Sequence, residues 1–226
     1  MSRIVFDDEY VIVMPSFKEV LPHKHSFYHV FWVGGDAEQL YVVGGNMRHV
    51  MPPLPQCKLF LMIDPTSCMA ERIDGLLESG KPKTIDLLNG LDVTQCSDDE
   101  LKQRVRDCLI ANGLLETTKN DIDSEDYRVV RLLKELKAYK HLEKSIQEIA
   151  DQYGLSDSRL SHVFKECMGV SLKGYLNIKQ MQYAYKLIMD GESITYAALE
   201  AGFSSPAHLA AICKKQMGIS ISMVLR

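Results

Sequence analysis

One sequence pattern occurs twice toward the end of the chain, and this repeat constrains the fold more than any other feature. The first copy runs from Ser145 to Gly169 and the second from Ser193 to Gly218. Equivalent residues are offset by 48 positions before the central turn and by 49 after it, so two copies of one supersecondary unit are the simplest explanation. The recurring pairs are Ile146/Ile194, Ala150/Ala198, Gly154/Gly202, Leu160/Leu209 and Gly169/Gly218.

Each copy predicts two short helices joined by a turn. In the first copy, Ser145 and Glu148 form a capping box at the start of a helix. Gly154 can take the positive φ that ends this helix and turns the chain. Ser156 then caps a second helix. The predicted buried stripe of that second helix consists of Leu160, Val163, Phe164 and Cys167.

The opposite face of this second helix is polar and basic. Such a face, on a helix braced by a preceding helix, is typical of a protein that reads the DNA major groove. The competing interpretation is an ordinary helical hairpin with a solvated face, and the second copy at matching internal spacing argues against it. The outward residues are Ser158, Arg159, Ser161, His162 and Lys165.

Motifs in both copies carry a resemblance to a known family. They are Ile146-x-x-x-Ala150-x-x-x-Gly154-Leu155-Ser156, Leu160-x-x-x-Phe164-Lys165, Gly169-Val170-Ser171, Ala201-Gly202-Phe203-Ser204 and Gly218-Ile219-Ser220. Through them, residues 126–226 resemble the DNA-binding domain of the arabinose-regulator (AraC/XylS) family of bacterial transcription factors. The resemblance implies two helix-turn-helix units that read successive major-groove turns on one face of double-stranded DNA. It also implies a homodimer, with RNA polymerase as a further partner.

The sequence departs from the family pattern at several positions, and two of these departures bear on DNA binding. The helix predicted to join the copies, from about Leu172 to Met189, has Gln180-Met181 where the family usually has Arg-Leu. The second copy places alanine at outward positions, including Ala207 and Ala210. Alanine cannot form a bidentate pair with a base edge, although it can touch a thymine methyl group.

We therefore expect the two copies to divide the work of binding DNA. The first copy is predicted to read base edges, chiefly through Arg159 and His162, and the second to hold phosphates. The predicted DNA-binding residues are Ser158, Arg159, Ser161, His162, Lys165, Lys179, Ala207, His208, Lys214 and Lys215.

At 226 residues with 46% apolar content, the chain is long enough for two small domains with separate cores. Residues 1–127 carry 12 Lys/Arg against 21 Asp/Glu, whereas residues 128–226 carry 14 against 9. An acidic half beside a basic half suits a regulatory domain attached to one that binds a polyanion. We predict a sensor domain at 1–115, a polar linker at 116–126 and a DNA-binding domain at 127–226.

The sequence predicts a cytoplasmic protein without a membrane partner. It has no apolar run of membrane-spanning length, and its N-terminus lacks the pattern of a secretory signal. The six cysteines form no close pairs, so reduced and mostly buried thiols are expected. The alternative for two of them is a redox-sensing pair of Cys57 with Cys68.

Residues 1–62 contain short β-type runs separated by Pro and Gly. These runs predict a small cupin-like β-barrel or sandwich followed by helices, so the fold class of the whole chain is α+β. The predicted strands are Tyr10–Met14, Phe27–Val33, Gln39–Val43 and Lys58–Ile63, with turns at Gly34-Gly35-Asp36 and Gly44-Gly45-Asn46.

Four of the seven histidines, His23, His25, His29 and His49, fall in this region. The stretch from His23 to His29 resembles the cupin motif His-x-His-x-x-x-Glu, with His29 in the place of the acidic residue. Alternate strand residues share a face, so these imidazoles can converge in one cavity. They are candidate ligands for a divalent transition metal such as Zn, Ni, Fe or Cu. The alternatives are an organic effector in the same cavity, and no ligand.

Two helices are predicted between the strands and the linker. Thr66 or Ser67 caps the first, whose inward residues are Met69, Ile73, Leu76 and Leu77. A capping box from Ser97 to Glu100 starts the second, which has an apolar stripe of Leu101, Val105, Cys108 and Leu109. This stripe either packs within its own domain or forms a partner-helix surface, because such helices commonly make the dimer in the resembled family.

Together these features predict a sequence-specific DNA-binding transcription regulator that responds to an effector through its N-terminal domain. They do not predict an enzyme, because the sequence places no catalytic acid or base beyond the histidines. Two alternatives come from other classes of protein. One is a regulator-like interaction protein with weak or lost DNA binding, and the other is a cupin-type metal-binding protein or metalloenzyme.

Overall fold

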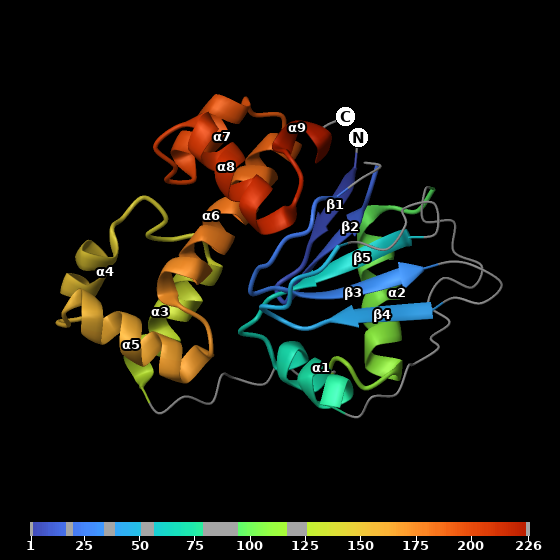
Figure 1. The fold of residues 1–226 in the computed structure, drawn as a ribbon, viewed down its shortest axis with the longest axis horizontal. Helices are drawn as coiled ribbons and strands as arrows, with labels where there is room; N and C mark the ends of the chain where they lie inside the picture. The colour runs from blue at the N-terminus through green and yellow to red at the C-terminus, as the bar shows by residue number, and fades with distance from the viewer. Residues whose placement is uncertain are drawn as a thin grey trace. The chain divides into compact units, whose positions relative to one another are not determined.

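The computed structural model of the chain describes residues 2–16, 20–33, 39–50, 57–78, 95–116 and 126–224. The chain divides into two compact units (Figure 1): Met1–Asp121 with Ser222–Arg226 form the first, and Ile122–Ile221 form the second. Within the described ranges, no helix combines the length and the apolar character needed to cross a bilayer.

The first unit is built on an antiparallel sheet of five strands in the order β1-β2-β5-β3-β4. The four predicted strands are confirmed, and so is the α+β class. Among the described strands, β1 and β4 are the two edges and do not pair with each other, so the sheet is open over this part of the chain. The strands are β1 (Arg3–Phe6), β2 (Tyr10–Met14), β3 (Tyr28–Val33), β4 (Gln39–Val43) and β5 (Cys57–Ile63).

Strand β1 was not predicted, because its run of β-forming residues, from Ile4 to Phe6, is very short. It has four residues, and its strand conformation depends on its pairing with β2, in which Arg3 lies opposite Met14 and Phe6 opposite Val11. The predicted turn that ends at Asn46 is present, with Asn46 itself at a φ of 61°. The predicted turn at 34–36 lies outside the described residues.

Two helices, α1 (Cys68–Glu78) and α2 (Asp98–Ala111), cover one face of this sheet, and α2 crosses behind the strands in Figure 1. The capping box at Ser97 is confirmed. The stripe of α2 packs within its own unit, so it is not the partner-helix surface that the sequence also allowed. This core consists mainly of Val30, Trp32, Leu59, Leu61 and Ile63 from the sheet, Met69 and Ile73 from α1, and Leu101, Val105 and Leu109 from α2.

The ends of these helices are held by polar contacts. The hydroxyl of Ser67 accepts the N–H of Ala70 at 3.3 Å, so Ser67 caps α1. The side chains of Leu76 and Leu77 lie outside the described residues. Arg72 forms an ion pair with Glu116, the residue at which the predicted linker begins.

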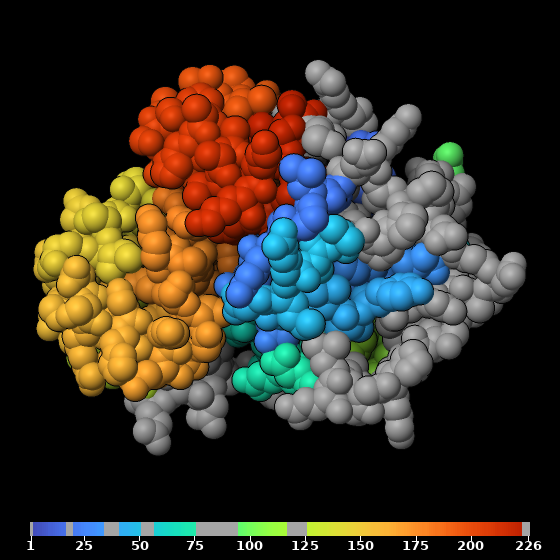
Figure 2. Space-filling view, viewed as in Figure 1, coloured from blue at the N-terminus to red at the C-terminus, as the bar shows by residue number. Residues whose placement is uncertain are grey.

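From Asp126 to Val224 the described chain is helical. The two predicted helix pairs are present as α4–α5 and α7–α8, and α6 runs from one pair to the other (Figure 1). The atoms of these helices, coloured yellow to red, form one continuous surface in Figure 2. The helices are α3 (Tyr127–Lys137), α4 (Ile146–Gln152), α5 (Asp157–Met168), α6 (Leu172–Met189), α7 (Ile194–Glu200), α8 (Pro206–Met217) and α9 (Ile221–Val224).

The buried stripe of α5 differs from the prediction at one residue. Leu160, Val163 and Phe164 are buried as expected, but Cys167 is exposed. Met168 is buried in its place, because the residue four positions after Phe164 returns to the same helix face.

The six cysteines are free thiols, and Cys57 and Cys68 form no disulfide. Burial raises the pKa of the Cys57 thiol to about 12 and the pKa of the Cys213 thiol to about 11. Both thiols are therefore protonated near neutral pH, the form that is neither nucleophilic nor ready to oxidise.

Candidate DNA interface and histidine cluster

The first helix pair is fixed by caps that can be read directly from its sequence. The Ser145 hydroxyl accepts the N–H of Glu148, and the Glu148 carboxylate accepts the N–H of Ser145. Gly154 lies in the left-handed region at a φ of 65° and turns the chain into α5. The Ser156 hydroxyl then accepts the N–H of Arg159 and caps α5. These contacts set the angle at which α5 leaves the turn.

The outward face of α5 keeps most of its polar groups free for a ligand. Arg159, His162 and Lys165 are exposed. Among the described residues, the side chains of Arg159 and Lys165 have no hydrogen-bond or ion-pair partner. His162 differs, because its Nε2 lies 3.1 Å from the carboxylate of Glu166 one turn away. Sequence reasoning missed Glu166, which shares the face that is proposed to meet DNA.

The second helix pair repeats the same construction with different surface chemistry. Ser193 caps α7, and Ser205 caps α8 by accepting the N–H of His208. Pro206 occupies the first turn of α8, where its missing N–H costs no helical hydrogen bond. The ring of His208 packs edge-on against Phe203 at 5.4 Å between centroids.

The exposed side chains of α8 offer little to a base edge. Ala207 and Ala211 are exposed and Ala210 is half-buried. Lys214 and Lys215 in the last turn are exposed, and neither has a hydrogen-bond or ion-pair partner among the described residues. The chemistry of this helix suits phosphate contacts more than base readout.

Lys179 does not belong to the DNA-facing set, and its prediction is corrected here. Its side chain is only 4% exposed on the buried side of α6. Its ammonium group donates to Oε1 of Gln182 at 3.1 Å and lies 5.3 Å from the centroid of the Tyr175 ring. An ammonium held in this way is not available to a phosphate.

Gln180 has a role that the sequence did not reveal. It stands where the family pattern usually has an arginine, and it is buried at 6% exposure. Its amide donates to the carbonyl of Leu142 at 2.7 Å and to that of Gly202 at 3.3 Å. Leu142 precedes α4 and Gly202 lies in the turn after α7, so one side chain of α6 joins the two helix pairs.

Glu135 of α3 is a second unpredicted anchor, and it acts on the first pair. Its carboxylate accepts hydrogen bonds from the Tyr153 hydroxyl at 2.7 Å and from Arg131 at 3.0 Å, and it lies 2.7 Å from Nε2 of His141. The hydrogen bond from Tyr153, with those from His141 and Arg131, lowers the pKa of Glu135 to about 2. The ionised carboxylate ties α3 to the end of α4.

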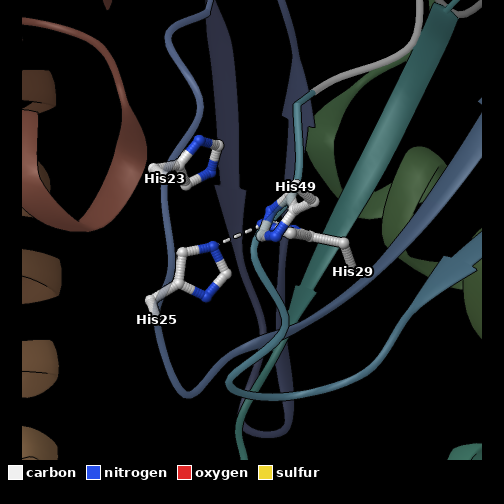
Figure 3. A group of neighbouring side chains, drawn as sticks. All are labelled: His23, His25, His29 and His49. Carbon is white, nitrogen blue, oxygen red and sulfur yellow. Dashed lines mark hydrogen bonds between the residues drawn. The ribbon is translucent and has the colours of Figure 1, made fainter.

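In the first unit, the structure brings the four predicted histidines together (Figure 3). His29 comes from β3, His23 and His25 from the segment before it, and His49 from the segment after β4. His23 and His49 also pair through their backbones, with N–H to carbonyl distances of 3.0 Å in both directions. One ring nitrogen from each histidine lies within 4.8 Å of the other three.

Backbone carbonyls fix the tautomers of three of these rings. The Nδ1 atoms of His23, His29 and His49 lie 2.8, 3.3 and 2.9 Å from the carbonyls of Leu21, Leu61 and Met47. A carbonyl accepts but cannot donate, so each Nδ1 carries the hydrogen and each Nε2 keeps its lone pair.

The fourth ring, His25, completes the cluster through a hydrogen bond between nitrogens. Nε2 of His25 lies 2.8 Å from Nε2 of His29 and donates to it, since the latter holds a lone pair. Two buried nitrogens then have no hydrogen-bond partner, Nδ1 of His25 and Nε2 of His49. Buried polar atoms without partners are rare in folded proteins, so these two need an explanation.

The buried rings of His25 and His29 are neutral near pH 7. Burial lowers the pKa of His25 to about 3, and burial with the neighbouring rings lowers the pKa of His29 well below its usual value. The ring of Phe31 packs 5.1 Å from that of His29, and the ring of Phe60 lies 5.6 Å away. Neutral imidazoles beside an aromatic wall can act as ligands to a metal or as partners for an organic molecule.

The second unit thus has two capped helix-turn-helix pairs on a common joining helix, which is the architecture of a DNA-binding domain. The family model described as "Helix-turn-helix domain" matches residues 127–226. Residues 127–226 therefore match a helix-turn-helix domain, which agrees with the resemblance of this region to the DNA-binding domain of AraC/XylS regulators.

Known proteins similar to the chain agree with this assignment. An uncharacterized HTH-type transcriptional regulator from Staphylococcus aureus strain MSSA476 is 34% identical over 86 residues. The match covers 38% of this chain but only 12% of that relative's length. Two crystal structures of ToxT from Vibrio cholerae are also similar. The first has a TM-score of 0.51, and the match covers 100% of this chain and 97% of the ToxT chain. The second has a TM-score of 0.50, and the match covers 96% of this chain and 95% of the ToxT chain. At 15% identity, both show a shared fold alone.

Proposed function

We propose that this chain is a sequence-specific DNA-binding transcription regulator whose first unit responds to an effector. The observation that carries the proposal is the repeated, capped helix-turn-helix with a free basic face on α5. One arginine, two serine hydroxyls and one imidazole on this short helix supply hydrogen-bond donors for the acceptors on base edges in the major groove. The helix-turn-helix family match over 127–226 supports the same conclusion.

The two pairs are proposed to bind DNA in different ways. On α5, Arg159 and His162 contact base edges, supported by Ser158 and Ser161, while Lys165 contacts a phosphate. On α8, Lys214 and Lys215 contact phosphates, and Ala207 and His208 lie at the groove edge. The joining helix α6 has 18 residues and so is about 27 Å long. With the flanking helices, this length allows the pairs to reach grooves about one turn, ~34 Å, apart.

The first experiment selects binding sites for the full chain from random double-stranded DNA and then measures affinity for the winning site at several salt concentrations. We expect a defined sequence to be enriched. We also expect the logarithm of the association constant to fall with the logarithm of the salt concentration, with a slope of about −3 or steeper. The reason is that at least three lysines are proposed to displace counterions from phosphates. Arg104→Ala on α2, an exposed arginine of the first unit, serves as the matched control and should leave the slope unchanged.

A second candidate function has one observation in its favour, the alanine face of α8. A protein with only one reading helix can serve as an interaction partner whose DNA binding is weak or lost. Selection that enriches no sequence, together with binding that does not weaken as salt is added, would favour this candidate over the regulator.

Several finer points belong to the same proposal. We place the protein in the cytoplasm, with RNA polymerase as a partner, and we assign it no catalytic activity. We also propose a homodimer, whose surface is not the buried stripe of α2. Light scattering of the purified chain tests the dimer directly, because a dimer of this chain has twice the mass of 25.6 kDa.

A further inference from the structure

We propose that His23, His25, His29 and His49 form a binding site for one divalent transition-metal ion, with Zn²⁺ as the ion that the arrangement fits best. The site is independent of DNA binding. Only its use as an effector site would rest on the function proposed above. The argument has three parts: the closeness of the ring nitrogens, the type and number of the ligands, and the segments that the ion would join.

The four rings gather their nitrogens within the span of one ion, with one nitrogen of each ring within 4.8 Å of the others. In three of the rings, a backbone carbonyl holds Nδ1–H and leaves a lone pair on Nε2, which is the arrangement that supports and orients metal-binding histidines. The unpartnered Nε2 of His49 is buried and has a lone pair that an ion would satisfy. With these tautomers, none of the other three rings offers a hydrogen to that nitrogen.

His25 would join the site by a change of tautomer. Its Nε2 hydrogen, which now points at His29, would move to Nδ1, and Nε2 would take its place as the fourth ligand. The ring stays neutral throughout, and no net proton is released. Around a tetrahedral ion with bonds of ~2.0–2.1 Å, neighbouring nitrogens lie about 3.3 Å apart. The present spread of up to 4.8 Å, with a shortest separation of 2.8 Å, is close to this value.

The ligand set selects the class of metal. All four ligands are imidazole nitrogens and none is a carboxylate, which argues against Ca²⁺ and Mg²⁺, since both prefer oxygen. Imidazole suits Zn²⁺, Ni²⁺, Cu²⁺ and Fe²⁺. Three of the four residues are buried and the fourth is half-buried, so little room is left for further ligands such as water. Four protein ligands in a closed site are typical of structural Zn²⁺.

An ion bound here would join three stretches that are separate in sequence. His23 and His25 lie before β3, His29 lies in it, and His49 follows β4. Near the histidines, hydrogen bonds join these stretches: the backbone pairing of His23 with His49, the N–H of Asn46 to the carbonyl of His25, and the single bond between the rings of His25 and His29. Coordination would replace that single bond with four, so the ion should stabilise this edge of the first unit.

The test uses the full chain, stripped with a chelator and dialysed against ZnCl₂ or CoCl₂. We expect one equivalent of either metal by elemental analysis, and visible d–d absorption of the intensity typical of tetrahedral Co²⁺. The thermal midpoint should rise by about 10 °C or more when free Zn²⁺ is a thousandfold above its dissociation constant.

Variants separate this cluster from adventitious surface binding. His49→Ala is the first choice, because His49 is half-buried and its ring bonds only to the carbonyl of Met47. The affinity of this variant for Zn²⁺ should fall by more than ~100-fold. Loss of a residue that only supports a metal ligand already costs up to about 100-fold, and loss of a ligand should cost more. His29→Ala probes the buried side, with circular dichroism to check its fold. Lys24→Ala, an exposed neighbour in the same segment, should still bind one equivalent.

Two results would overturn the proposal. One is a full chain that takes up no stoichiometric Zn²⁺ or Co²⁺. The other is a His49→Ala variant that binds both metals as tightly as the unchanged chain. Either result would make the four histidines a hydrogen-bonded cluster without a metal. Both results are measured without DNA. A failure of the proposed metal site is therefore distinguishable from a failure of the proposed regulator function.

Discussion

The two helix-turn-helix copies share a scaffold but differ in what surrounds it. Each begins with a serine cap, turns at a glycine of positive φ and ends with a glycine in the left-handed region, at a φ of 69° for Gly169 and 67° for Gly218. The outward face of α5 carries an arginine, an imidazole and hydroxyls, whereas that of α8 carries alanines and two lysines. Burial and capping account for the shared positions, whereas the outward positions, which neither of these constrains, differ between the copies.

The copies are also anchored in different ways. The first is tied to α3 through the carboxylate of Glu135. The second is tied to the rest of its unit at its turn, where Gly202 meets the carbonyl of Leu142 and the amide of Gln180. The turn glycine of the first copy, Gly154, has no atom within 4 Å of where a Cβ would be. Equivalent sequence positions therefore have different packing demands, and this difference can be tested.

The largest effect is expected at Gly202, the turn glycine of the second copy. In Gly202→Ala, the new Cβ would overlap the carbonyl oxygen of Leu142 and lie 2.7 Å from its carbon, at a φ of 84° that disfavours side chains. We expect a loss of at least ~3 kcal/mol in the free energy of unfolding. Gly154→Ala is the matched control and should cost about 1 kcal/mol, for its φ alone. Urea denaturation measures both, and equal losses would show that the close approach at Gly202 is unimportant.

Gln180→Ala tests the link between the copies. The substitution leaves the Leu142 carbonyl without its 2.7 Å donor in a buried place. An unsatisfied buried acceptor costs ~1–3 kcal/mol, so the free energy of unfolding should fall by about 2 kcal/mol. Gln147→Ala on α4 is the control, because Gln147 is exposed and bonds only to Asp151. A Gln180→Ala variant as stable as this control would contradict the linking role.

Arg159→Ala tests the division of DNA readout between the copies. We expect a loss of ~1–3 kcal/mol on the specific site and a relaxed preference at one or two base positions. Ala210→Ser on α8 should leave the sequence preference nearly unchanged. Fluorescence anisotropy over a panel of single-base variants of the site measures both. If the two substitutions shift the preference equally, it is wrong that the first copy reads base edges while the second holds phosphates.

Glu135→Gln gives the smallest effect, one that depends on pH. The pKa of Glu135 is lowered to about 2, so its ion pairs and hydrogen bonds stabilise the fold above the ordinary glutamate pKa of 4.5. This contribution is lost as the pH falls from about 5 to about 2. The carboxylate is partly exposed, so solvent screening reduces the expected difference at pH 7 to about 1 kcal/mol. Urea titrations across pH 2–7 should show the unfolding free energies of the two proteins converging in acid. A difference that persists at pH 2 would refute the ionisation of Glu135 as its cause.

Local sequence patterns were sufficient for most of the secondary structure. Serine caps, glycine turns and apolar spacing predicted α4 to α8 and the start of α2, because all these signals act between residues a few positions apart. Period-two runs predicted four strands for the same reason. The run in strand β1 is too short to give such a signal, and its conformation depends on a partner strand. Cys167 and Met168 were confused because they follow Phe164 by three and four positions, and both spacings return to the same helix face, so periodicity alone does not decide which one is buried.

The sequence by itself determined that this chain repeats a helix-turn-helix, that one copy carries the basic face, and that four histidines fall near one another in the first unit. Tertiary structure alone decided that Lys179 and Gln180 turn inward, that Glu135 gathers three partners, and that backbone carbonyls fix three of the four imidazole tautomers. These facts depend on contacts between residues up to 38 positions apart, as with Gln180 and Leu142. Caps and periodicity are local and leave a trace in the sequence, whereas the partner of a buried polar group is set only when the chain has folded.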